Sequence, residues 1–180
     1  MTSEQLELLK YPIGKLNFPE QVTATHIEEW KKNIETFPER FSALVNDLND
    51  EQLNTPYRPG GWTVRQLIHH VADSHTHAYI RFKWTLSEEN PIIKAYNQDG
   101  YANLNDSKGP IDLSLTYLKA LHAKLIYLIN GMEPEDFNRT FIHPENKMVY
   151  SLLRTLATYA WHGEHHYAHI NHLLKRKDWK

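Results

Sequence analysis

The stretch Trp161-His-Gly-Glu-His-His-Tyr-Ala-His-Ile-Asn-His172 holds five histidines within eleven residues. It lies inside a longer segment, Leu152 to Leu174, that contains no proline and carries apolar residues every three or four positions. This spacing predicts an amphipathic helix, with Ser151 as its N-cap and the basic run Lys175–Lys177 at its C-terminal end. Two imidazoles four residues apart on one helical face can hold a transition-metal ion together.

The angular positions of these histidines separate those near the core from those near water. At about 100° per residue, His166 lies roughly 60° from the centre of the apolar stripe and His162 roughly 100°. His169 lies roughly 120° from that centre, and His165 and His172 lie at larger angles. We therefore expect His162 and His166 to border the core, and His165 and His172 to face water. The alternative is a polar face that happens to be rich in histidine, but a pair at the core edge favours a metal site.

The composition predicts a soluble globular protein and excludes several classes of function. The chain has 180 residues, of which 41% are hydrophobic and 23% charged, and its formal net charge is −2. This length suits one domain, spanning residues 1–180. No basic run precedes Lys175–Lys177, so nucleic acid is not an expected partner. The absence of cysteine excludes disulfides, thiolate ligands and a protein thiol nucleophile.

The sequence also gives no indication of export or membrane insertion. The first residues, Met1-Thr-Ser-Glu-Gln-Leu6, lack a basic segment followed by an apolar run, so we expect no signal peptide. No apolar stretch approaches the length needed to span a bilayer. We therefore expect a cytoplasmic protein with no membrane partner.

Three further amphipathic helices are predicted before the last one, and together the four make an all-α four-helix bundle. Their approximate ranges are Thr23 to Leu48, Val64 to Leu86 and Asp112 to Asn130. Pro38 should kink or split the first of them. Thr63 and Gln66 form a capping box for the second, and Asp112 is the expected N-cap of the third.

The connections between these helices are long. Residues 1–22 contain Pro12 and Pro19 and are expected to form an extended arm. Residues 87–111 form a long polar connection, and the sequences on either side of Pro144-Glu-Asn-Lys147 predict a short β-hairpin before the last helix. Connections of this length allow crossovers, so two sequential helices can run parallel.

A second group of histidines lies on the second helix. His69 and His70 flank its apolar stripe at similar angles, roughly 130°, so periodicity does not choose between them. The side of the helix around His69 looks solvated, and Asp73 is placed to orient His70 through a hydrogen bond. We expect His75 to be a core-facing imidazole bonded to a neighbour, and His77 fits a pocket wall or a solvated face equally well.

These segments together resemble the DinB-like superfamily, specifically its YfiT-type metal-dependent hydrolases, which are also described as bacillithiol transferases. The resemblance extends over nearly the whole chain. The segments that carry it are Tyr11-Pro-Ile-Gly-Lys15, Thr55-Pro-Tyr-Arg58, Gly60-Gly-Trp-Thr-Val-Arg-Gln-Leu67, His69-His-Val-Ala-Asp-Ser-His75, Arg81-Phe-Lys83, His143-Pro144, and Trp161-His162 with His165-His-Tyr-Ala-His-Ile170.

The resemblance implies a metal site of three histidines on a bundle with unusual crossover connections. Carried over residue by residue, the ligands are His70, the second histidine of the pair after Gly-Gly-Trp, and the H-x-x-x-H pair His162 and His166. The sequence departs from the family at Gly163-Glu164, and because Glu164 points away from the ligand face we assign it no role.

Three neutral histidines leave a divalent cation with open coordination positions, as in catalytic rather than structural sites. Such an ion can lower the pKa of a bound water toward about 7 or deprotonate a bound thiol. Our first hypothesis is a metal-dependent S-transferase that joins a small thiol, by resemblance bacillithiol, to an electrophile. The alternatives are a metal-dependent hydrolase of an amide or ester, and a non-catalytic, stress-associated metal-binding bundle.

Several details of this hypothesis follow from the residues or stay open. We expect one divalent ion per chain, with Zn²⁺ as the default and Ni²⁺ also suited to imidazole ligands. The loop Tyr57–Gly61 and residues 87–111 are candidates to wall the pocket. Arg58 could meet an anionic cosubstrate there, although an exposed surface arginine is the alternative. Whether the chain forms a homodimer is left open.

Overall fold

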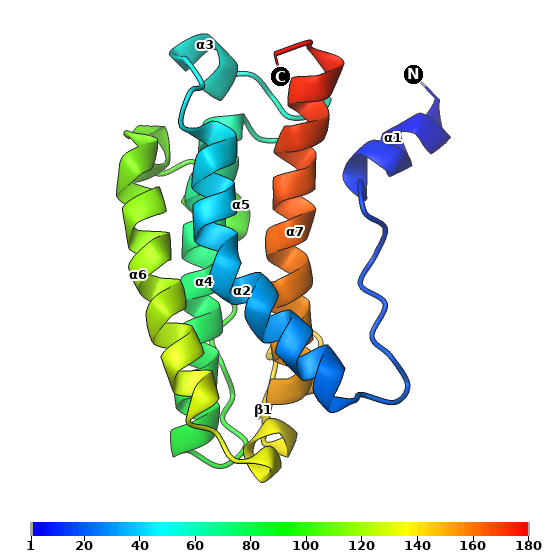
Figure 1. Cartoon of the computed structure of the whole chain (residues 1–180), viewed down its shortest axis with the longest axis vertical. Coiled ribbons are helices and arrows are strands. Elements are labelled where there is room, and N and C mark those ends of the chain that lie inside the picture. The colour runs from blue at the N-terminus through cyan, green and yellow to red at the C-terminus, as the bar shows by residue number, and fades with distance from the viewer. Residues whose placement is uncertain (1, 180) are drawn as a thin grey trace.

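The computed structural model describes residues 2–179, and four long helices make up its body. They are α2 (Ala24–Val45), α4 (Val64–Ser87), α6 (Ile111–Asn130) and α7 (Leu152–Arg176). Helix α2 packs against α6 and α7, and α4 packs against the same two helices, so the core lies between the four (Figure 1). The predicted all-α bundle is confirmed.

The order of directions is unusual for a bundle. In Figure 1, α2 and α7 run upward, whereas α4 and α6 both run downward. Residues 88–110 must therefore return along the length of the bundle between α4 and α6, and they include the short helices α5 (Gln98–Ala102) and η1 (Asp106–Lys108). The prediction that a long connection allows two sequential helices to run parallel is confirmed for α4 and α6.

The starts of the helices follow local chemistry, with one correction. Helix α4 begins after the predicted capping box, in which the N–H of Gln66 donates to Thr63 Oγ1 (3.1 Å) and the N–H of Thr63 donates to Gln66 Oε1 (3.0 Å). Ser151 caps α7 by accepting from the N–H of Arg154. Asp112 is not the N-cap of α6, because Pro110 takes that position with a φ of −61° that suits a helix start.

The N-terminal arm is only partly extended. Residues Ser3–Lys10 form helix α1, which begins with a capping box between Thr2 and Gln5. The prediction of an extended arm over residues 1–22 was therefore wrong for this stretch, because Pro12 ends the helix but does not prevent it from starting. The arm then lies beside α7 and enters α2 (Figure 1).

Short elements close the two ends of the bundle. Helix α3 (Asp50–Leu53) lies between α2 and α4, and η2 (Pro134–Asn138) follows α6. The predicted hairpin is present as strands β1 (Thr140–Ile142) and β2 (Val149–Ser151), which pair antiparallel. The crossover is tied to this hairpin, since the N–H of Ile93 donates to the carbonyl of Ile142 (3.1 Å).

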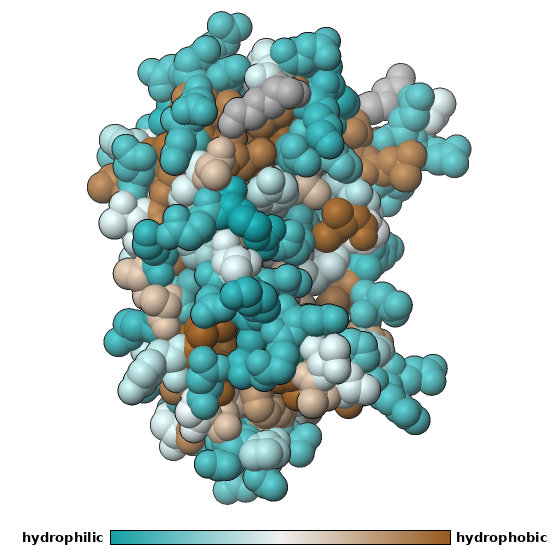
Figure 2. Space-filling model, viewed as in Figure 1, coloured by the Kyte–Doolittle hydropathy of each residue, from teal (hydrophilic) through white to brown (hydrophobic). Residues whose placement is uncertain are grey.

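Pro38 lies inside α2, which continues through it as one helix but changes direction part-way along its length (Figure 1). The face of the molecule in Figure 2 is mainly hydrophilic, with small separate hydrophobic patches. Among the described residues, no helix combines the length and apolarity needed to cross a bilayer.

Candidate metal site

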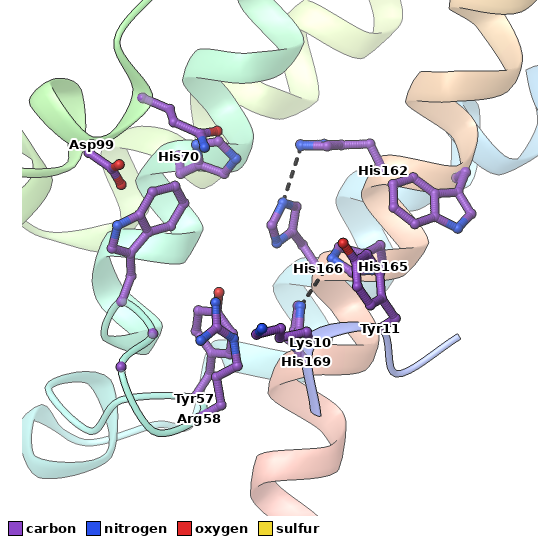
Figure 3. Close-up of a pocket in the computed structure, with 15 residues that line it drawn as sticks. Lys10, Tyr11, Tyr57, Arg58, His70, Asp99, His162, His165, His166 and His169 are labelled. Carbon is purple, nitrogen blue, oxygen red and sulfur yellow. Dashed lines mark hydrogen bonds between the residues drawn. The ribbon is translucent and has the colours of Figure 1, made fainter. Parts of the chain in front are cut away.

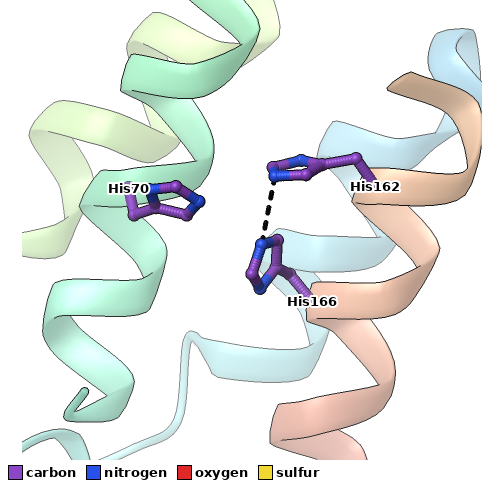
Figure 4. Close-up of side chains that lie close together, drawn as sticks. All are labelled: His70, His162 and His166. Carbon is purple, nitrogen blue, oxygen red and sulfur yellow. Dashed lines mark hydrogen bonds between the residues drawn. The ribbon is translucent and has the colours of Figure 1, made fainter. Parts of the chain in front are cut away.

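Two helices bring the three predicted ligands together. His70 comes from α4, and His162 and His166 come from successive turns of α7, so the three imidazoles face one another across the bundle (Figure 4). One ring nitrogen from each lies within 4.8 Å of the others, and the Nε2 atoms of His162 and His166 are 3.1 Å apart. Two imidazole nitrogens on one tetrahedral zinc ion are separated by about 3.3 Å. The residues therefore fit a divalent ion.

Burial keeps these imidazoles neutral. It lowers the pKa of His70 to about 4. The pKa values of His162 and His166 lie well below 6.5, because burial is reinforced by the neighbouring imidazoles. A neutral imidazole offers the lone pair that a metal ion requires, so the site is ready for an ion at neutral pH.

A pocket of about 420 Å³ opens onto this site (Figure 3). Its walls come from the arm, from the loop before α4, from α5 and from one face of α7. The lining residues are Lys10, Tyr11, Tyr57, Arg58, Gly60, Gly61, Trp62, His70, Gln98, Asp99, Trp161, His162, His165, His166 and His169. The loop Tyr57–Gly61 and the connection 87–111, which were predicted to wall the pocket, both contribute lining residues.

The loop before α4 holds Arg58 in the wall of the pocket. Pro59 and Gly60 form a tight turn, in which the N–H of Gly61 donates to the carbonyl of Arg58 (3.0 Å) and Gly60 has a φ of +67°. Arg176 of α7 anchors this loop by donating to the carbonyl of Tyr57 (2.7 Å). The Nε of Arg58 is buried and has no hydrogen-bond partner within residues 2–179.

A second group of imidazoles lies beside the first and shares His166 with it. His165 and His169 have their Nε2 atoms 3.0 Å apart. The prediction that His165 faces water was wrong, because Trp161 stacks on it at 4.5 Å and Tyr11 of the arm approaches its ring. Together with His166, this pair forms a second candidate set of ligands, and all three of its ligands come from α7.

The remaining predictions on α4 have mixed outcomes. His69 is buried rather than solvated, since its Nε2 lies 3.3 Å from the carbonyl of Gly109 and its Nδ1 lies 2.8 Å from Ser114 Oγ. No hydrogen bond joins Asp73 to His70 in the described part of the chain. Burial and the charge of Asp106 instead raise the pKa of Asp73 to about 6.

Other polar residues near the site have structural partners. His77 stacks on Tyr96 at 4.1 Å and is not among the residues that line the pocket. Glu164 forms an ion pair with Arg40 of α2, which explains why it points away from the ligands. This ion pair is not predictable from the sequence, because its partners are 124 residues apart.

Known proteins resemble the chain along almost its whole length. Residues 33–170 match the model of the DinB superfamily. A protein of Bacillus pumilus named "Putative metal-dependent hydrolase" is 48% identical over 95% of this chain and 98% of its own length. A protein of Oceanobacillus iheyensis with the same kind of name is 50% identical over 94% of this chain and 98% of its own.

Solved structures agree with these matches. YfiT from Bacillus subtilis, described as "a probable metal-dependent hydrolase with an unusual four-helix bundle topology", superposes with a TM-score of 0.93 at 40% identity over 96% of this chain and 99% of YfiT. A mycothiol-dependent maleylpyruvate isomerase shares the fold alone, with a TM-score of 0.60 at 16% identity over 80% of this chain and 63% of its own. The three-histidine geometry, the parallel α4 and α6 and these matches together show that the chain belongs to the DinB superfamily.

Proposed function

We propose that this protein is a metal-dependent enzyme that transfers a small thiol, of the bacillithiol type, to an electrophilic substrate. The observation that carries the proposal is the convergence of three neutral imidazoles, from His70, His162 and His166, on one side of a 420 Å³ pocket. We propose one ion per chain, with Zn²⁺ as the first candidate and Ni²⁺ as the second.

A divalent ion bound by three histidines supplies positive charge that favours the deprotonated form of a water or thiol beside it. The chain contains no cysteine, so a thiol nucleophile has to enter with a cosubstrate. A free thiol has a pKa of about 8.5 and is mostly protonated at neutral pH, so it gains reactivity from such a site.

The pocket residues bind and orient in this proposal. Lys10 and Arg58 bring two positive charges to the pocket lining, beside the carboxylate of Asp99, and these charges favour a cosubstrate with an anionic group. Trp62 packs on His70 with ring centroids 4.6 Å apart and narrows the pocket beside the ligands. Positioning a thiol and an electrophile side by side contributes to rate independently of its activation.

The second candidate is hydrolysis of an amide or ester at the same site. The names of the relatives from Bacillus pumilus and Oceanobacillus iheyensis favour it. The site suits it equally, because the same open position accepts a water molecule. A bundle that binds metal without turnover is the third candidate.

The deciding experiment incubates the Zn²⁺-loaded protein with bacillithiol and a model electrophile such as monochlorobimane, and measures conjugation above the background rate. We expect acceleration that requires metal and is abolished in His162→Ala. The matched control is His172→Ala, which changes an exposed histidine of the same helix.

Two further outcomes assign the rival functions. Thiol-independent cleavage of ester or amide substrates, with no acceleration of conjugation, would replace the transferase with the hydrolase. Stoichiometric metal binding with no turnover across both substrate panels would favour the non-catalytic bundle.

A further inference from the structure

A row of buried imidazoles extends from the metal site into the core. His162 Nδ1 lies 3.2 Å from His75 Nε2, and His75 Nδ1 lies 2.8 Å from His122 Nε2. His122 Nδ1 in turn lies 2.6 Å from the carbonyl oxygen of Ile34 in α2. We refer to His162, His75 and His122 as the histidine row. His75 is 0% exposed and His122 1%, so water does not compete for these contacts.

The far end of the row rests on a carbonyl that a proline has left free. In an α-helix the carbonyl of Ile34 would accept from the backbone N–H four residues later. That residue is Pro38, which has no N–H. His122 Nδ1 fills the vacancy, so the proline inside α2 creates the acceptor on which the row ends.

The hydrogen bonds of the row have only one consistent direction. A carbonyl oxygen only accepts, and a neutral imidazole carries a single ring N–H, so the hydrogen of His122 must be on Nδ1. Its Nε2 therefore accepts from His75 Nδ1–H, and His75 Nε2 accepts from His162 Nδ1–H. The remaining nitrogen of His162, Nε2, keeps its lone pair and is the atom that faces His166 across 3.1 Å.

We propose that His75 and His122 are positioning residues that set the tautomer and ring orientation of His162 before any metal ion binds. The proposal rests on the metal site proposed above, because the Nε2 lone pair of His162, which lies near Ser74 Oγ (3.4 Å) and His166 Nε2 (3.1 Å), is the one that would bind the ion. Ligating histidines commonly donate their second N–H to a carboxylate, a carbonyl or water. Here the imidazoles of His75 and His122 link His162 to the backbone carbonyl of Ile34.

The row orients His162 and does not carry protons away from the site. It ends on the carbonyl of Ile34, which cannot accept and pass on a proton at neutral pH. Phe37 holds the two inner imidazoles in place, with ring centroids 5.9 Å from His75 and 5.7 Å from His122. By contrast, His166 Nδ1 is buried without a partner among the described residues, and its Nε2 faces His162 Nε2 across 3.1 Å, so no backbone acceptor fixes the tautomer of His166.

The first test reads the tautomer directly in the metal-free protein. Long-range ¹H–¹⁵N correlation spectra at pH 7.5 distinguish an imidazole with N–H at Nδ1 from one with N–H at Nε2. We expect His162, His75 and His122 to be Nδ1–H tautomers in the wild type. An Nε2–H tautomer at His162 overturns the proposal, whatever the metal affinity.

The second test compares variants by Zn²⁺ competition against a chelator and by the same spectra. His75→Leu should leave His162 as a mixture of tautomers and weaken Zn²⁺ binding by about 10–100-fold. His75→Gln should restore most of the affinity, since its amide can accept from His162 and donate to His122. His69→Gln, at another buried histidine of α4, is the matched control with no expected change.

The outcomes separate this proposal from the proposed metal site. Unchanged tautomer and affinity in a folded His75→Leu overturns the proposal. If that variant does not fold, the wild-type spectra and the His75→Gln comparison decide it. A wild type that binds no Zn²⁺ but shows Nδ1–H at His162 refutes the metal site and leaves the direction of the row standing.

Discussion

At the scale of single residues, the two groups of imidazoles compete for one ion through His166. In one group, His166 is joined by His70 from α4 and His162 from α7. In the other it is joined by His165 and His169, and all three ligands come from one helix. Ligands from two helices can surround an ion more completely than ligands from one face, and His162 is also held by the histidine row. We therefore propose that the ion binds in the first group.

Substitutions can separate the two groups. We expect His70→Ala and His162→Ala to lose most of the bound Zn²⁺ after dialysis against a metal buffer, because each leaves two imidazoles. His165→Ala and the surface control His172→Ala should retain it, as measured by elemental analysis. Loss in His165→Ala with retention in His162→Ala would move the ion to the second group. His166→Ala cannot discriminate, because both groups need it.

Asp73 offers a second prediction at this scale. Its folded-state pKa of about 6 lies above the ordinary value of 3.8 for an aspartate, because of burial and the charge of Asp106. The folded state therefore binds a proton more tightly than the unfolded chain, and its stability falls as pH rises from about 4 to above 6. Asp73→Asn removes the buried charge, so we expect a free energy of unfolding higher by about 1 kcal/mol at pH 7.5, after allowance for solvent.

Urea denaturation at pH 7.5 and pH 4 checks this sign, because the difference should nearly vanish at pH 4. A variant less stable at pH 7.5 would contradict it. A loss of Zn²⁺ affinity of about 10–100-fold would instead support the sequence-based prediction that Asp73 orients His70.

The sequence predicted the edge positions of His162 and His166 because helical periodicity locates a residue relative to the main core. It misplaced His165 and His69 for a physical reason. His165 is buried by Tyr11 and Trp161, and His69 by the turn before α6, none of which belongs to the packing stripe of its own helix. The helical spacing of apolar residues does not predict burial by arms and loops.

At the scale of elements, Pro38 links the shape of α2 to the site. Pro38→Ala supplies a backbone N–H that competes with His122 for the carbonyl of Ile34. Sharing that acceptor should weaken the bond of His122 by about 0.5–1 kcal/mol, and Zn²⁺ binding about two- to fivefold, while the helix stays intact. Competition with a chelator measures the Zn²⁺ affinity, and circular dichroism measures the helix content. Unchanged Zn²⁺ affinity in the folded variant would show that the bond from His122 to the carbonyl of Ile34 does not influence the metal site.

Gly163 decides how closely α7 packs on α2. A Cβ built there would lie 3.0 Å and 3.1 Å from ring atoms of Phe37. Alanine normally stabilises a helix by about 1 kcal/mol relative to glycine, but forced overpacking costs about 1–3 kcal/mol. We expect a net loss of about 1 kcal/mol in Gly163→Ala by thermal denaturation.

The double variant Gly163→Ala with Phe37→Leu tests the cause of that loss. A smaller side chain at position 37 relieves the contact, so the two effects should not add. A single Gly163→Ala variant more stable than the wild type would show that α7 has room to spare at this position.

Long elements were predictable and short ones were not. The four bundle helices and the hairpin came from periodicity and turn residues over many positions. Helix α1 was missed because its eight residues carry only three apolar side chains, and α3 and α5 because a helix of four or five residues has no usable period. Their capping residues, Thr2 with Gln5 and Asn49 with Gln52, were the signal that could have found α1 and α3.

At the scale of the whole molecule, the buried histidines make the metal-free protein sensitive to acid. Burial holds the pKa of His70, His122 and His165 at about 4 and that of His169 at about 3, below the 6.5 of an exposed imidazole. The unfolded chain therefore binds more protons between pH 6.5 and pH 4, and stability is lost as pH falls through that window.

Below about pH 6.5 we expect the free energy of unfolding to fall by at most about 1.4 kcal/mol per pH unit for each such histidine, and by less for the partly exposed His165. Urea denaturation of metal-free protein at pH 7.5, 6.0 and 5.0 measures the slope, and His169→Gln should reduce it. Bound Zn²⁺ should raise stability at pH 7.5 and lose that effect toward pH 5 as protons compete for the imidazoles. A stability that is constant down to pH 5 would contradict the neutral state of these groups.

The place of the arm has a practical consequence for anyone who purifies this protein. Helix α1 spans eight residues, or about 12 Å, and ends at Lys10 in the pocket wall. A polyhistidine tag fused ahead of α1 would begin within reach of His165 and His169 and bring extra imidazoles to the pocket. Nickel resin would at the same time offer Ni²⁺ to the site. Metal contents measured on tagged material would then report the chromatography as much as the protein.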